Sequence, residues 1–115
     1  MLSQTYGLAL RQAGYGVACA YAAQDAIQSA DDQKPNLVVL ELQLADHDGL
    51  EFLYEFRSYA EWQQIPAIVL SNLPPPALAA IEKVLYQDLG VKRCLYKPRT
   101  TLDQLIKAIA EQVAS

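Results

Sequence analysis

The chain has 115 residues, a length that fits one domain with its own hydrophobic core. Its composition, 52% hydrophobic and 19% charged, is typical of a globular protein and excludes a mainly disordered chain. The net charge is −4 and no basic stripe alternates with aromatic residues, so direct binding of nucleic acid is not expected. No apolar segment approaches the roughly 20 residues that span a bilayer, and no secretory signal pattern opens the chain, which predicts a cytosolic protein without membrane attachment. Cys19 and Cys94 are too few for a disulfide-stapled secreted domain, and we expect both to be small buried residues.

Helical and extended patterns alternate along the chain, which predicts an α/β fold with a parallel sheet and crossover helices. The expected helices cover residues 1–13, 22–30, 50–59, 77–87 and 102–113. The expected strands cover residues 17–20, 37–40, 66–70 and 93–96. Strands 37–40 and 66–70 are apolar throughout, as expected for strands buried on both faces. No repeat or linker interrupts this order, so residues 1–115 are expected to form a single domain.

Local signals mark the ends of several helices. Gly14 and Gly90 are expected to end the first and the fourth helix. The three prolines at 74–76 stiffen the entry to the fourth helix, whose first turn tolerates proline. Thr101 and Gln104 have the spacing of a capping box at the start of the last helix.

Polar residues follow three of the expected strands. Glu41, Ser71 and Lys97 each come at the carboxyl end of one of the last three strands, and Pro98 follows Lys97. Open α/β folds place their chemistry at this edge of the sheet. These three residues are therefore the candidate functional site.

The segment around Glu41 resembles the phosphoacceptor segment of response-regulator receiver domains. That segment usually consists of an aliphatic strand, Asp, Leu, x, Leu, Pro, x, x, Asp, Gly, and here it ends in Asp48 and Gly49. The resemblance holds in register over nearly the whole chain and implies a flavodoxin-like, receiver-like three-layer sandwich. In receivers the matching positions hold the acceptor Asp, a Ser or Thr that contacts the phosphoryl group, and a Lys that pairs with its charge. By this resemblance Ser71 and Lys97 match the family, whereas Glu41 does not.

Further departures affect the parts that phosphoryl transfer needs. Receivers carry two adjacent acidic residues after their first strand, which hold the divalent metal that neutralises the moving charge. This chain begins inside what corresponds to the first helix, so that strand and its acidic pair are absent and Mg²⁺ binding is expected to be lost. Asp46 and Asp48 are not expected to substitute, because Asp48 suits a helix cap and Asp46 a solvated loop. Ala45 replaces the usual Pro, and Cys94 stands where receivers commonly carry the Tyr or Phe that reports phosphorylation.

Two roles stay open for Glu41. Its carboxylate reaches about one bond further than that of Asp, so it could approach Lys97 and Ser71 as a phosphorylated Asp would and hold an activated-like state. Alternatively, Glu41 forms a plain ion pair with Lys97, which contributes little to stability where solvent reaches it.

The missing first strand is expected to cost stability. The receiver sheet has the order 2-1-3-4-5, so this strand would lie between residues 17–20 and 37–40, and its loss leaves about four strands. Four or five buried apolar side chains are worth on the order of 6–15 kcal/mol, which rivals the stability of a whole domain. The two strands could pair directly, two chains could exchange elements across a shared sheet, or the natural protein is longer. We expect a homodimer as the compensation.

The sequence therefore predicts a pseudo-receiver, a non-enzymatic module of two-component or phosphorelay signalling that works by protein contact without phosphorylation. A histidine kinase or another signalling protein is the expected partner. By family analogy the interaction face includes Tyr86, Lys92, Arg93 and Tyr96. The alternatives are a phosphorylatable receiver truncated at its start, a small flavodoxin-like enzyme, and a purely structural protein or non-functional gene remnant. An enzyme is disfavoured because the sequence contains no glycine-rich phosphate loop, metal cluster or nucleophile with its base.

Overall fold

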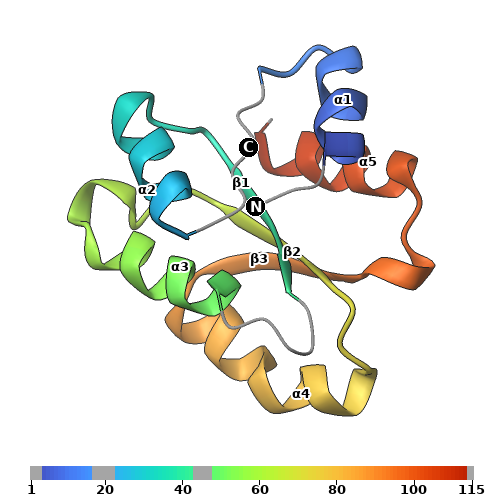
Figure 1. The fold of residues 1–115 in the computed structure, drawn as a ribbon. Helices are drawn as coiled ribbons and strands as arrows, with labels where there is room; N and C mark the ends of the chain where they lie inside the picture. The colour runs from blue at the N-terminus through green and yellow to red at the C-terminus, as the bar shows by residue number, and fades with distance from the viewer. Residues whose placement is uncertain (1–3, 17–22, 43–47, 114–115) are drawn as a thin grey trace.

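The computed structural model describes residues 4–16, 23–42 and 48–113, which form a parallel sheet between two layers of helices (Figure 1). In this part of the chain the sheet has three strands in the order β1 (Val38–Leu42), β2 (Ala67–Ser71) and β3 (Val91–Tyr96). The central strand β2 is buried at all five positions, which explains its uninterrupted apolar run. Because both neighbours pair with β2 in parallel, the three carboxyl ends lie at one edge of the sheet.

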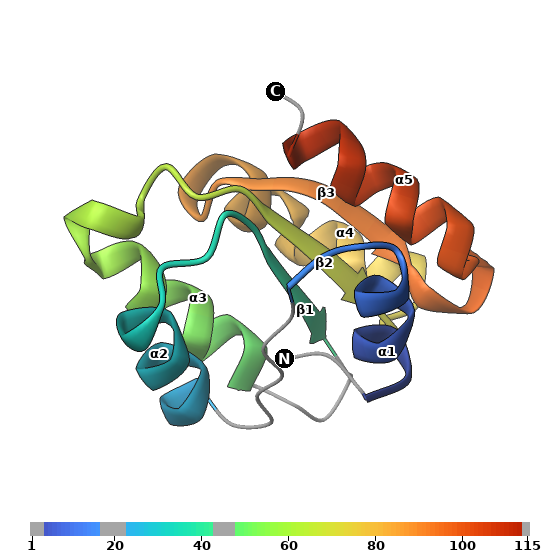
Figure 2. The same cartoon turned by 90° about the horizontal axis from the view of Figure 1, so that it is seen from above.

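The helices lie on both faces of this sheet. Their bounds are Gln4–Gln12 (α1), Ala23–Asp32 (α2), Asp48–Ser58 (α3), Pro75–Lys83 (α4) and Leu102–Val113 (α5). Short 3₁₀ turns follow at Ala60–Trp62 (η1) and Lys97–Arg99 (η3), and a π-helical turn at Val84–Asp88 (η2). Helices α1 and α5 cover one face, whereas α2, α3 and α4 cover the other (Figure 2).

Alternate side chains of β2 divide the hydrophobic core into two parts. Ile68 and Leu70 pack against α1 and α5. Ala67 and Val69 belong to the larger cluster on the opposite face, which contains residues of α2, α3 and α4. This division follows from the two-residue period of a strand, which points successive side chains to opposite faces.

Within the described residues the predicted helices and three of the predicted strands are confirmed, with shifts of one to a few residues at several ends. Residues 1–3 and 22, which the prediction assigned to the first two helices, lie outside the described residues. The expected strand at 17–20 lies outside the described residues, so the total of four strands stays a prediction. Helix α2 continues two residues beyond the predicted end, because the Gln28 side-chain amide donates to the Asp32 carboxylate (3.0 Å) in its last turn. Helix α4 begins at Pro75, earlier than predicted, and continues into η2.

The predicted capping box of α5 is confirmed. The backbone N–H of Gln104 donates to the Thr101 hydroxyl (3.1 Å), and the backbone N–H of Thr101 donates to the Gln104 side-chain oxygen (2.8 Å). Two backbone donors that α5 itself leaves without partners are satisfied in this way. The backbone of Gly14 and of Gly90 has φ of 99° and 63°, a region that favours glycine, where the first and fourth helical segments end.

Arg57, in the last turn of α3, binds backbone carbonyls of two loops. Its Nη1 donates to the carbonyl of Trp62 (2.7 Å) and its Nε to the carbonyl of Leu89 (2.8 Å). A longer bond joins Nη2 to the carbonyl of Gly90 (3.4 Å). Burial lowers the pKa of the Arg57 guanidinium from its usual value, although an arginine stays charged in proteins. One cation thus ties the end of α3 to the segments that lead into β2 and β3.

Replacing this cation tests how far the fold depends on it. We expect Arg57→Met to lower the free energy of unfolding by about 2–4 kcal/mol, because three carbonyls lose a charged donor. Urea unfolding can be followed by the fluorescence of Trp62, the only tryptophan, which is 3% exposed.

Arg99→Met is the matched control, because Arg99 is exposed and its loss should change the free energy of unfolding by less than about 0.5 kcal/mol. Equal effects of the two substitutions would contradict the role assigned to Arg57.

Candidate functional site

The backbone places the three predicted site residues at the same edge of the sheet. Glu41 in β1 is in register with Leu70, one residue before Ser71, and Ser71 is in register with Tyr96, one residue before Lys97. With about 3.3 Å per residue and about 4.8 Å between strands, the Cα atoms of the outer two positions are roughly 12 Å apart. The three positions are therefore close enough to form one site.

Ser71 is buried and its hydroxyl is engaged. The side chain has no exposed surface, and its Oγ accepts a hydrogen bond from the backbone N–H of Leu73 (2.9 Å). This local bond stabilises the turn that leads from β2 towards α4. In this bond the Ser71 oxygen is the acceptor, so the hydroxyl still has its own hydrogen to donate.

Lys97 begins the η3 turn directly after β3 and is half-buried. Its carbonyl accepts from the backbone N–H of Thr100 (3.2 Å), while the Thr100 hydroxyl donates to the carbonyl of Tyr96 (2.7 Å). These bonds and Pro98 fix the backbone on both sides of Lys97. The turn therefore holds the ammonium-bearing residue at the carboxyl edge of the sheet.

Cys94 stands where receivers commonly carry the Tyr or Phe that reports phosphorylation, and its backbone is hydrogen-bonded to Tyr86. The backbone N–H of Cys94 donates to the Tyr86 hydroxyl (3.0 Å), which connects η2 to β3. Burial raises the pKa of the Cys94 thiol and of the Tyr86 phenol, so the thiol stays protonated at neutral pH and is a weak nucleophile. Sequence analysis missed this contact, because no local pattern joins a residue before Gly90 to one after it.

The predicted interaction face is partly exposed. Tyr86, Lys92 and Arg93 are exposed, and Arg93 forms an ion pair with Glu111 of α5 (3.5 Å). Tyr96 is half-buried, and the guanidinium of Arg99 lies 6.0 Å from the centre of its ring. The four residues therefore do not form one uniformly exposed patch.

The described residues at the carboxyl edge do not fit a divalent-metal site. Within residues 4–16, 23–42 and 48–113, no three His, Cys, Asp or Glu side chains come together as metal ligands. Asp48 is the first residue of α3, and Asp46 lies outside the described residues. The loss of Mg²⁺ binding stays a prediction.

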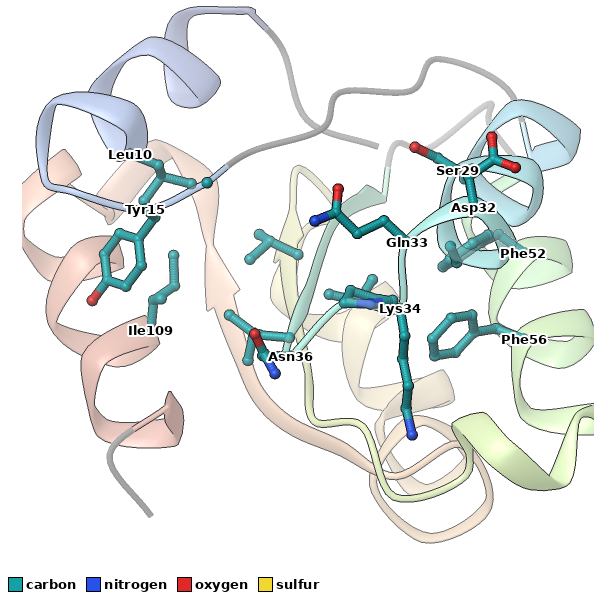
Figure 3. Close-up of a pocket in the computed structure, with 17 residues that line it drawn as sticks. Leu10, Tyr15, Ser29, Asp32, Gln33, Lys34, Asn36, Phe52, Phe56 and Ile109 are labelled. Atoms are coloured by element: carbon teal, nitrogen blue, oxygen red, sulfur yellow. The ribbon is translucent and has the colours of Figure 1, made fainter.

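A cavity of about 680 Å³ lies beside the amino-terminal half of β1. Figure 3 shows Leu10, Tyr15 and Ile109 on one side of it and Phe52 and Phe56 on the other. Polar side chains line it as well: Ser29, Asp32, Gln33, Lys34 and Asn36. The cavity lies along the segment that leads into β1 and along the first residues of β1. Its walls combine apolar and polar side chains.

None of the helices in the described part of the chain is long and apolar enough to span a membrane.

The described part of the chain has a parallel sheet with helices on both faces and polar residues at the carboxyl ends of the strands. These features define a flavodoxin-like α/β fold of the receiver class. The chain matches the family model of the response regulator receiver domain over residues 1–110, and it belongs to that family of two-component signalling domains. Solved structures agree in fold. A sensor protein from Polaromonas sp. JS666 is 20% identical, with a TM-score of 0.79 over 96% of this chain and 86% of that chain. A putative response regulator from Chloroflexus aurantiacus is 22% identical, with a TM-score of 0.78 over 97% and 88%.

The receiver domain of a sensor histidine kinase from Pseudomonas aeruginosa PAO1 is 23% identical, with a TM-score of 0.76 over 97% of this chain and 88% of that chain. The crystal structure of that domain has a magnesium ion coordinated in its active-site cleft. At these identities the similarity concerns the fold. The predicted recognition and the predicted fold class are thus both confirmed.

The bond of Ser71 can be tested by removing its hydroxyl. We expect Ser71→Ala to lower the free energy of unfolding by about 1–2 kcal/mol, because the Leu73 N–H loses its acceptor in a buried turn. Amide hydrogen exchange at Leu73 should become faster at the same time.

Ser58→Ala serves as control, because the Ser58 hydroxyl donates to the carbonyl of Glu55 (2.5 Å) at an exposed site. A Leu73 amide that stays equally protected in Ser71→Ala would show that this hydroxyl does not hold the turn.

Proposed function

We propose that this receiver domain transmits its signal by protein contact and does not accept a phosphoryl group at position 41. The observation that carries the proposal is the glutamate at the acceptor position, in register with the residue before a serine that is buried and hydrogen-bonded within its own turn. In this account the domain is a cytosolic, non-enzymatic pseudo-receiver, and its partner is a histidine kinase or another signalling protein.

Geometry supports the loss of transfer. Phosphoryl transfer depends almost entirely on positioning and on electrostatic stabilisation of the moving charge. The extra methylene of Glu41 shifts a carboxylate by more than 1 Å, and displacements of about that size can cost a factor of about 100 in rate. Transfer also needs a cation that neutralises the developing charge, and within the described residues no three His, Cys, Asp or Glu side chains come together as metal ligands.

The rival within the family is a receiver that is still phosphorylated. Ser71 and Lys97 favour it, because both residue types match the family pattern at their positions. A phosphorylated receiver requires a hydroxyl that can reach the phosphoryl group. The Ser71 side chain is buried, and its oxygen accepts a hydrogen bond from the backbone N–H of Leu73. This requirement separates the two accounts experimentally.

Intact mass after incubation with Mg²⁺ and acetyl phosphate tests the proposal. We expect no increase of about 80 Da, the mass of one phosphoryl group, because the residue at the acceptor position differs from that of the family. Glu41→Asp restores the family's residue type at this position and is the informative comparison.

Glu41→Gln controls for phosphorylation elsewhere, since any adduct that persists in it lies on another residue. A stoichiometric adduct on the unchanged protein that disappears in Glu41→Gln would overturn the proposal.

The proposal includes a homodimer. Its support is the cavity beside β1, part of whose wall is apolar. An apolar surface of this kind is more stable when another segment covers it. A second copy of the chain provides such a segment at any concentration above the dissociation constant.

Sedimentation equilibrium at micromolar concentration should therefore give twice the chain mass of 12.7 kDa. Replacing Val39 by Lys, within the cavity wall, should shift the equilibrium towards monomer, because a charge would have to be buried in the interface. Lys34→Glu at the polar rim is the control. A stable monomer of the unchanged protein would remove the homodimer from the account.

A further inference from the structure

The charges of this chain are unevenly distributed. Residues 92–115 contain five Lys and Arg against two Asp and Glu, whereas residues 1–91 contain four against eleven. The C-terminal part is therefore net positive in a protein whose overall charge is −4. The five cations are Lys92, Arg93, Lys97, Arg99 and Lys107.

The structure gathers three of these cations around one groove between β3 and α5. The groove has a volume of about 430 Å³, and Arg93, Arg99 and Lys107 line it together with one carboxylate, that of Glu111. The half-buried Leu95 also lines it and supplies apolar surface, whereas Ala108 at its base is buried. The groove thus combines an apolar part with an excess of positive charge.

The single carboxylate does not neutralise this excess. Glu111 lies 3.5 Å from Arg93, and the two side chains are 50% and 46% exposed. An ion pair at this distance and exposure contributes little, so an incoming carboxylate can compete with Glu111 for Arg93. Arg99 is exposed, and its guanidinium lies 6.0 Å from the centre of the Tyr96 ring. An exposed guanidinium can donate to carboxylates.

We propose that the groove between β3 and α5 is the docking site for a short acidic segment of a partner protein. Asp or Glu side chains of this segment bind Arg93, Arg99 and Lys107, and its apolar residues contact Leu95. The inference rests on the proposed function in that it names the chemistry of the partner through which the domain signals.

Two other occupants fit less well. A nucleic acid is a long polyanion, and the net negative charge of residues 1–91 would repel the part of it that extends beyond the groove. A second copy docked on this groove about a twofold axis would bring its own excess of cations against the same cations. A short acidic peptide segment avoids both conflicts.

The test uses the full chain and a short fluorescein-labelled peptide in which Glu alternates with Leu and Ser. Fluorescence anisotropy should show saturable binding that weakens as salt is raised, because exposed charges are screened. The peptide with Gln in place of each Glu should bind at least about tenfold more weakly, since it lacks the charges that the cations recognise.

Variants locate the site. Arg93→Glu should weaken binding of the acidic peptide about tenfold, whereas Glu111→Gln should strengthen it about two- to threefold, because a competing carboxylate is removed. Lys34→Glu makes the same change of charge in the loop before β1, where the side chain is also exposed, and should leave affinity within about twofold. Unchanged thermal unfolding of each variant confirms that it is folded.

Several results would overturn the docking site. These are no binding of the acidic peptide, equal binding of the Gln peptide, equal weakening by Lys34→Glu and Arg93→Glu, or no gain in Glu111→Gln. The proposed function fails separately, because a phosphoryl adduct at position 41 would remove it and leave the peptide measurements unaffected.

Discussion

Burial of β2 on both faces is the constraint on which the rest of this structure depends. Its five residues have almost no exposed surface, and their side chains alternate between the two helical layers. A shift of one residue in the pairing of β2 would move each buried side chain to the wrong layer. The register is therefore strongly specified, and with it the positions of Ser71 at the end of β2 and of Glu41 and Lys97 on the neighbouring strands.

The residues that maintain the fold differ from those at the carboxyl edge of the sheet. The apolar strands, the helical layers and the loops tied by Arg57 preserve the receiver fold, and the family model matches almost the whole chain. At the carboxyl edge, however, the hydroxyl of Ser71 contributes to a buried turn, and the backbone of Cys94 is bonded to Tyr86. In this chain, the Ser71 hydroxyl and the Cys94 backbone, at two positions that the family uses in phosphorylation, form hydrogen bonds that stabilise the fold.

Periodicity predicted the helices and the described strands well, because each depends on burial of a face that the sequence displays directly. The capping box of α5 was equally predictable, since Thr101 and Gln104 are three residues apart. The carbonyl bonds of Arg57 were not, because they join loops distant in sequence, and a basic residue at the end of a helix is unremarkable by itself. The positive groove escaped notice because a net charge for the whole chain conceals the difference between its two parts.

The central claim is that a receiver scaffold persists around a pocket that no longer receives a phosphoryl group. Its most direct test is to record backbone amide NMR spectra during titration with Mg²⁺ and then with fluoroberyllate, which imitates a bound phosphoryl group. The account predicts that the amide signals of Ser71, Leu73 and Lys97 stay in place. Saturable shifts at these three amides, dependent on both additions, would contradict it.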